Sequence, residues 1–258
     1  MRRRAFLAAT AAAAAAGASV PRLGATPAAK TFVLVHGAWH GGWCWQALAA
    51  ELQSRGHAIY APTLSGLAHR PATPEINADT HVNDVAQLIE VLDLQQVTLV
   101  LHSYAGLLGG ALLHRLRPRL AQIAWLEAVL PSPGQSLLDL LPEPARQRYR
   151  QAAAEHGQGW LLPPPDVAQF GLPSPELAQT VASQLSAQPF RSFTEAISLP
   201  QADVLAFPGR YLLASDRPSQ PYAGFADQAR AAGWPVSQAT GGHLLMLTNS
   251  IAVADFLS

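Results

Sequence analysis

Ser103, Asp216 and His243 are polar residues whose types and order suit a serine nucleophile with a proton relay. A serine hydroxyl is a weak nucleophile at neutral pH, because it must lose its proton as it attacks. An imidazole within hydrogen-bond distance can take that proton, and a carboxylate can fix the tautomer of the ring and stabilise its charged form. We therefore predict Ser103 as the nucleophile, His243 as the base and Asp216 as the acid that orients it.

Ser103 lies where an apolar, β-branched run (V-T-L-V-L-H) gives way to a small-residue helix pattern (Y-A-G-L-L-G-G). This predicts a nucleophile elbow, the sharp strand-to-helix turn usually written G-x-S-x-G. Leu101 and Ala105 occupy the two glycine positions, and Gly106 follows at once. Leu101 puts a large side chain where the turn is tightest, so the motif needs support from its partners.

An oxyanion hole needs two backbone donors beside the serine. The run K-T-F-V-L-V-H ends at Gly37. The N–H of Ala38, just past this strand, and the N–H of Tyr104, just past the nucleophile, are the predicted donors.

Glu127 is an alternative acid, because it also follows an apolar strand. We prefer Asp216, since it lies on the strand just before the one that leads to His243. The two glycines before His243 would let a loop carry the ring inward.

Short apolar runs alternate with helix-period segments, which predicts an α/β fold with a mostly parallel sheet flanked by helices. Ligands of such sheets gather at the carboxyl ends of the strands, where Ser103, Ala38 and Glu127 are expected. A helix to about Leu92 is predicted, with Asp79 or Thr80 as its N-cap. The predicted strands are 30–36, 57–60, 97–102, 122–126, 209–214 and 236–239.

Prolines break the chain from about 131 to 200 into short pieces, with helical patterns at 137–153 and 176–187. We interpret this stretch as a mainly helical lid inserted between strands. Its large apolar residues either line a pocket or hold the lid to the core: Leu161, Leu162, Phe170, Phe190 and Phe193.

The chain has 258 residues, which suits one α/β domain with an insertion. Its 49% hydrophobic and 13% charged residues argue against a disordered or nucleic-acid-binding chain. The one cysteine, Cys44, excludes an internal disulfide.

Residues 1–25 are predicted to be an export signal, which leaves 26–258 as the folded domain. Arg2, Arg3 and Arg4 precede an alanine-rich apolar run, and R-R-A-F-L fits the twin-arginine pattern. Cleavage after Ala25 or after Ala18 fits the small-x-small rule. The run is too short and too weakly apolar for a stable membrane span, so a periplasmic or secreted protein is expected.

Four motifs carry a resemblance to a known group: F-V-L-V-H-G-A-W-H-G-G-W-C-W (32–45), G-H-A-I-Y-A-P-T-L-S-G-L (56–67), L-H-S-Y-A-G (101–106) and G-G-H-L-L-M-L (241–247). They resemble the small α/β-hydrolases related to plant methylesterases and hydroxynitrile lyases, and especially the bacterial, pyrethroid hydrolase-like esterases. The resemblance implies an α/β-hydrolase fold, a small-molecule ester substrate, and no metal or organic cofactor. It gives Ser103, His243, Asp216, Ala38 and Tyr104 the same roles as above.

Two positions separate esterases from lyases in this group. The lyases carry a threonine after the first-strand histidine and a lysine after the catalytic histidine, whereas Gly37 and Leu244 stand here. We therefore predict a serine esterase for small to medium apolar esters that works through an acyl-enzyme. Hydroxynitrile cleavage is one alternative, and a non-catalytic ligand-binding homologue, motivated by Leu101, is the other.

Overall fold

The computed structural model describes residues 29–216 and 221–258, so the predicted export signal lies outside the described residues. Six strands form one sheet in the order β2-β1-β3-β4-β7-β8, and every neighbouring pair is parallel. This confirms the predicted α/β class. The strands are β1 (Thr31–Val35), β2 (Ala58–Tyr60), β3 (Val97–His102), β4 (Leu120–Leu126), β7 (Gly209–Ala214) and β8 (Val236–Ala239).

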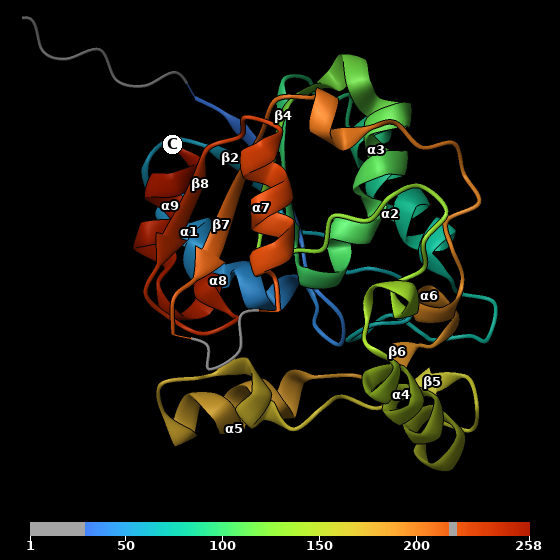
Figure 1. The fold of residues 1–258 in the computed structure, drawn as a ribbon. Helices are drawn as coiled ribbons and strands as arrows, with labels where there is room; N and C mark the ends of the chain where they lie inside the picture. The colour runs from blue at the N-terminus through green and yellow to red at the C-terminus, as the bar shows by residue number, and fades with distance from the viewer. Residues whose placement is uncertain (1–28, 217–220) are drawn as a thin grey trace, which may run out of the picture.

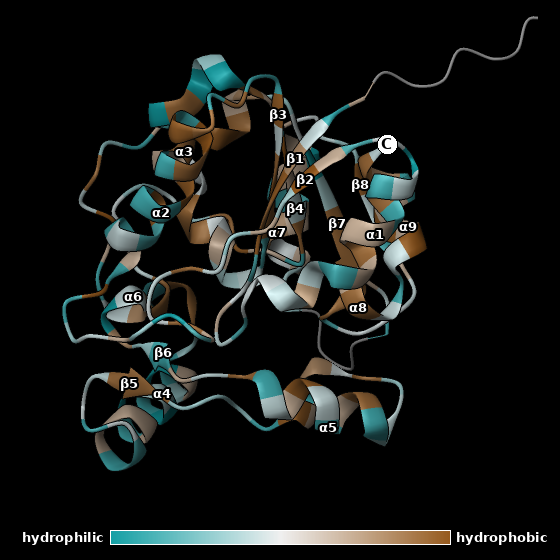
Figure 2. Ribbon diagram, turned by 180° about the vertical axis from the view of Figure 1, so that it is seen from behind, coloured by the Kyte–Doolittle hydropathy of each residue, from teal (hydrophilic) through white to brown (hydrophobic). Residues whose placement is uncertain are grey.

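The central strands are apolar because helices cover both faces of the sheet. Every residue of β3 is buried, and β1 is buried from Phe32 onward. The edge strands β2 and β8 keep partly exposed residues. Figure 2 shows the same contrast, with hydrophobic colour concentrated along the strands at the centre.

Helices lie in two layers around the sheet (Figure 1). Helices α1 and α9 pack against each other on one side, and α2 and α3 pack against each other on the other side, where α7 also lies. These helices are α1 (Gln46–Ser54), α2 (Ala78–Val91), α3 (Gly109–Leu116), α7 (Ala223–Ala231) and α9 (Ser250–Leu257). A further short helix, α8 (Leu245–Thr248), contacts α1. Short 3-10 helices precede α1 (η1, Gly42–Trp45) and α3 (η2, Ser103–Leu108), and another follows α3 (η3, Arg117–Arg119).

The start of α2 differs from the prediction. Asn77, not Asp79 or Thr80, is the N-cap: its side chain accepts the Thr80 N–H, and the Thr80 hydroxyl accepts the Asn77 N–H. This reciprocal pair satisfies two donors of the first turn. The Asp79 carboxylate instead accepts the N–H of Ser198, which ties α2 to the chain that leads back into β7.

The chain between β4 and β7 first forms a layer beside the carboxyl ends of the strands, at the bottom of Figure 1, and then returns to the amino end of the sheet, where β7 begins. It is mostly helical, with one short antiparallel pair of strands. Its elements are η4 (Leu138–Leu140), α4 (Glu143–His156), β5 (Leu161–Leu162), η5 (Val167–Phe170), α5 (Pro175–Gln184), β6 (Gln188–Pro189), α6 (Arg191–Thr194) and η6 (Val204–Ala206). We call residues 131–200 the lid.

No helix within the described ranges combines the length and apolar character that crossing a membrane requires.

Candidate active site

Ser103 lies at a true elbow. β3 ends at His102, η2 begins at Ser103, and Ser103 itself has a φ of +54°. A left-handed conformation costs a non-glycine residue about 1–2 kcal/mol, so the surrounding packing must hold it. One interaction that holds it is the hydrogen bond that the Val129 N–H donates to the Ser103 carbonyl over 3.2 Å.

Leu101 does not prevent the elbow from forming. Its fully buried side chain lies beside Gly109, where an added Cβ would come within 3.2 Å of Leu101 Cδ1 and 2.3 Å of the Trp125 ring. A Cβ on Gly106 would lie 2.1 Å from the Val129 carbonyl oxygen. The close approach that the usual motif obtains from its flanking glycines is thus obtained here from Gly106 and Gly109.

His243 is brought to Ser103 by the loop after β8. Its Nε2 lies 2.9 Å from Ser103 Oγ. The preceding Gly242 touches the lid, since a Cβ there would lie 2.2 Å from the Gly171 carbonyl oxygen, and the His243 N–H donates to the Phe170 carbonyl over 2.8 Å. A glycine is therefore needed at this position for the loop to pass under the lid.

Glu127 is the carboxylate that contacts the ring. Its Oε2 lies 3.3 Å from His243 Nδ1, and its Oε1 accepts the Ala214 N–H over 2.8 Å. Glu127 is fully buried and has a φ of +46° directly after β4. A buried carboxylate is stable only where partners compensate its lost hydration, and the neighbouring strand β7 supplies one of them.

Asp216 lies elsewhere, which corrects the predicted acid. Its carboxylate is exposed and accepts the Ser215 hydroxyl over 2.7 Å, and its N–H donates to the Gly241 carbonyl. Because β4 and β7 are paired in register at Leu126 and Leu212, the Ala214 backbone already faces Glu127. Asp216 comes two residues later, past the end of the strand and out towards solvent.

The sequence did hold a signal for Glu127. This glutamate directly follows the buried run Ile123–Leu126, so its side chain is expected to be buried as well. A buried carboxylate needs a partner, which is a signal for a functional contact. Asp216 sits between Ser215 and Pro218, a composition that is typical of an exposed turn.

The two predicted amide donors lie past the ends of the adjacent strands β1 and β3. Ala38 follows Gly37, where an added Cβ would lie only 2.8 Å from Ser103 Cβ, so the loop after β1 passes directly beside Ser103. Tyr104 N–H belongs to the first turn of η2, where donors have no partner within the helix. Ala38, Ser103 and Tyr104 all line the same cavity.

Neutral histidines fix the backbone around these donors. His36 Nε2 accepts the Leu64 N–H over 3.1 Å and its Nδ1 donates to the Gly37 carbonyl over 2.8 Å. Burial lowers the pKa of His36 to about 3, so the ring stays neutral and keeps this arrangement. His81 likewise accepts the Tyr104 hydroxyl over 2.8 Å, and burial lowers the pKa of His81 to about 4.

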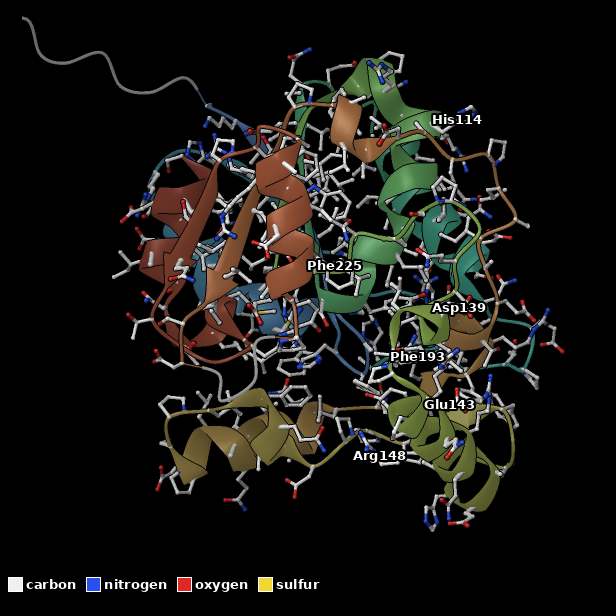
Figure 3. All side chains as sticks on the ribbon, in the orientation of Figure 1. His114, Asp139, Glu143, Arg148, Phe193 and Phe225 are labelled. Carbon is white, nitrogen blue, oxygen red and sulfur yellow. The ribbon has the colours of Figure 1, made fainter. Side chains whose placement is uncertain are left out.

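A mostly apolar cavity of about 340 Å³ opens over Ser103. Among the five apolar lid residues named above, only Phe193 lines it, whereas Phe170 stacks on the His243 ring with centroids 6.2 Å apart. Figure 3 labels Phe193 on α6 and Phe225 on α7, so the wall comes from both the lid and the sheet domain. Its aromatic residues are Trp39, Tyr104, Tyr149, Phe193, Tyr222 and Phe225.

Within residues 29–216 and 221–258, no three His, Cys, Asp or Glu side chains are grouped so as to hold a metal ion. Around Ser103 the structure brings together a hydroxyl, an imidazole that contacts it and a buried carboxylate, the types of group that acyl transfer uses.

Comparisons with known proteins identify the family of this chain. The model of the alpha/beta hydrolase family matches residues 32–256. A carbendazim hydrolyzing esterase from Nocardioides sp. (strain SG-4G) is 31% identical over 245 residues, which are 88% of this chain and 98% of that protein. A methyl jasmonate esterase from Vitis vinifera is 31% identical over 132 residues, half of each chain.

Solved structures share the fold. An extracellular alpha/beta-hydrolase from a Paenibacillus species superposes with a TM-score of 0.77 at 22% identity, over 88% of this chain and 97% of that one. A pyrethroid hydrolase from Sphingobium faniae JZ-2 gives 0.65 at 22% identity, over 89% and 96%. The predicted resemblance to methylesterases and bacterial esterases is thus confirmed, and the chain belongs to the alpha/beta hydrolase family.

Proposed function

We propose that this protein is a serine esterase that cleaves small to medium apolar carboxylic esters through an acyl-enzyme on Ser103. Ester hydrolysis is the activity that its family and its esterase-named relatives support. The observation that carries the residue assignment is the continuous contact from Ser103, which lines an apolar cavity, through His243 to Glu127.

In the resting site, His243 Nδ1–H donates to Glu127 and Nε2 accepts the Ser103 hydroxyl, which is the tautomer that the two contacts favour. As Oγ bonds to the ester carbonyl carbon, its proton passes to Nε2. The imidazolium then gives this proton to the leaving alcohol, and the same ring activates a water that hydrolyses the acyl-enzyme.

The Ala38 and Tyr104 amides are proposed to hold the oxyanion of each tetrahedral intermediate. They are part of the rigid backbone beside Ser103, so they need little reorganisation as the charge develops. Glu127 accepts the His243 Nδ1–H and stabilises the imidazolium.

The substrate class follows from the cavity. Its walls are aromatic and aliphatic, and its volume of about 340 Å³ accommodates a compact ring system. Carbendazim, which the Nocardioides relative is named for hydrolysing, is therefore a substrate worth testing.

Cyanohydrin cleavage is disfavoured at two positions. Leu244, next to His243, is apolar and fully buried, so it supplies no positive charge for a leaving cyanide. Gly37 has no room for the threonine of the lyases in this backbone, because a Cβ would lie 2.8 Å from Ser103 Cβ.

Hydrolysis of a panel of nitrophenyl esters by the wild type and by Ser103→Ala tests the proposal. We expect turnover that rises with acyl size until the cavity is filled, and that depends on Ser103. A folded wild type without turnover would support a non-catalytic ligand-binding protein instead.

We also propose that the protein is exported by the twin-arginine route, on the strength of Arg3 and Arg4 in R-R-A-F-L and the alanine-rich run after them. Expression with and without Arg3→Lys and Arg4→Lys, followed by fractionation, tests this. Unprocessed wild-type protein in the cytoplasm would contradict it.

A further inference from the structure

Tyr222 places a phenol hydroxyl beside the nucleophile. Its oxygen lies 3.2 Å from Ser103 Oγ, and its ring is almost parallel to the His243 ring, at 6° with centroids 5.2 Å apart. It comes from the N-cap position of α7 and lines the substrate cavity. None of the nucleophile, base, acid or amide roles described above uses this hydroxyl.

Counting protons gives the direction of this contact. Ser103 Oγ has one proton, which goes to His243 Nε2 because Nδ1–H is directed at Glu127. The Tyr222 hydroxyl is therefore the donor to Oγ in the resting site. Once Oγ has bonded to the substrate carbon, it becomes an ester-type oxygen and a poor acceptor.

The leaving-group oxygen then becomes an acceptor for this donor beside Oγ. It is attached to the same carbon as Oγ, and it must approach His243 Nε2 to receive the proton. Nε2 and the Tyr222 oxygen lie 2.9 and 3.2 Å from Oγ. Both groups therefore flank the atom that bonds to the substrate carbon, and a leaving oxygen on that carbon lies near both.

Building on the esterase function proposed above, we propose that Tyr222 is a catalytic residue whose hydroxyl donates a hydrogen bond to the leaving-group oxygen as the ester bond breaks. In this step the bond between carbon and leaving oxygen breaks with its electron pair going to that oxygen. The proton on His243 Nε2 moves to the same oxygen, and Tyr222 keeps its own proton throughout.

This role defines a substrate class. A second donor matters most when much negative charge develops on the leaving oxygen, as for alkyl alcohols, which are weak acids. It matters little for nitrophenol, which leaves readily as its anion. The site is thus built for esters of simple alkyl alcohols rather than activated aryl esters.

Tyr222→Phe tests the role, because it removes only the hydroxyl and keeps the ring stacked on His243. The substrates are four esters of one carboxylic acid, with methanol, trifluoroethanol, phenol and 4-nitrophenol as leaving groups. The quantity measured is kcat/KM, which reports acylation. We expect a loss of about tenfold to a hundredfold for the methyl ester, and of less than about threefold for the nitrophenyl ester.

Tyr149→Phe is the matched comparison, since it removes a hydroxyl from the same cavity on the lid side, at α4. Any loss in that variant should be equal for all four esters. An equal loss for all esters in Tyr222→Phe, or no loss, overturns the leaving-group role. Failure of the esterase proposal itself is distinguishable, because the wild type would then hydrolyse none of the four in a Ser103-dependent way.

Discussion

At the carboxyl end of the sheet, Ser103 and Glu127 each sit one residue past a strand of a parallel array. The lid instead reaches the site through short elements joined by proline-rich turns. Both strand-end residues have positive φ angles and are held by hydrogen bonds to neighbouring strands or their loops. The lid is attached through hydrogen bonds to several separate points of the sheet domain, among them Trp39, Asp79 and His243. The sheet thus fixes the reacting atoms, while the lid shapes the space around them.

The contrast predicts that substitutions at the sheet end change kcat, while those in the lid change KM and substrate preference. The largest effect is expected at the nucleophile. Ser103→Ala should lower kcat/KM about 10⁵-fold or more, because the attacking atom is removed while the cavity is kept. Ester hydrolysis measures it, and residual activity above about 1% of wild type would place the nucleophile elsewhere.

The acid gives the next largest effect, and the chain offers its own control. Glu127→Gln keeps the side-chain volume but cannot hold the His243 tautomer, so kcat should fall by about 10³ to 10⁴. Asp216→Asn, at the exposed position after β7, should stay within about threefold of wild type. A large loss of activity in Asp216→Asn, with little change in Glu127→Gln, would instead assign the acid role to Asp216.

Phe193→Leu tests the lid side of the comparison. Phe193 lines the cavity and stacks on Tyr104 with centroids 5.6 Å apart, so shortening it should raise KM for an aromatic ester about fivefold to tenfold and leave kcat nearly unchanged. Phe190→Leu is the same change at a lid residue that does not line this cavity. If both variants alter KM alike, the effect comes from loosening the lid and not from the cavity wall.

We expect a fall in pH to lower the stability of the folded protein through the buried histidines near the carboxyl end of the sheet. Activity at neutral pH should not be affected. Burial lowers the pKa of His36 to about 3 and those of His40 and His81 to about 4. Between these values and the ordinary pKa of about 6.5, the unfolded chain binds more protons than the folded one, so stability falls as the pH falls. Each histidine contributes up to about 1.4 kcal/mol per pH unit in that window.

Urea unfolding at a series of pH values measures this effect. The free energy of unfolding should be nearly level from pH 7 to 8 and should decrease steadily below about pH 6.5. A stability that is constant from pH 7 to 5 would mean that these rings titrate in the folded protein as they do in the unfolded chain, and would contradict the lowered pKa values.

The sheet could be predicted from the sequence because its strands are continuous apolar runs. Such runs indicate a sheet that is buried on both faces. The positions of Ser103 and His243 followed, since each comes directly after a strand or a glycine loop. The choice between Glu127 and Asp216 depended on how far a chain runs past its strand, which depends on tertiary contacts such as the Ala214 N–H.

The lid shows what local pattern leaves out. Proline spacing indicated short, mostly helical pieces, but not which apolar side chain would face the cavity. From the sequence, Phe170 was as plausible a residue of the cavity wall as Phe193, yet its ring packs on His243. Tyr222, in a turn before α7, carried no signal, because its position follows from the stacking of its ring on His243.

The most direct test of the relay is the rate at which a fluorophosphonate labels Ser103, followed by mass spectrometry of the intact protein. The wild type and Asp216→Asn should gain one adduct at similar rates, Glu127→Gln should react about a hundredfold or more slowly, and Ser103→Ala should not react. Equal labelling of Glu127→Gln and wild type, or slow labelling of Asp216→Asn, would contradict a nucleophile activated through His243 and Glu127.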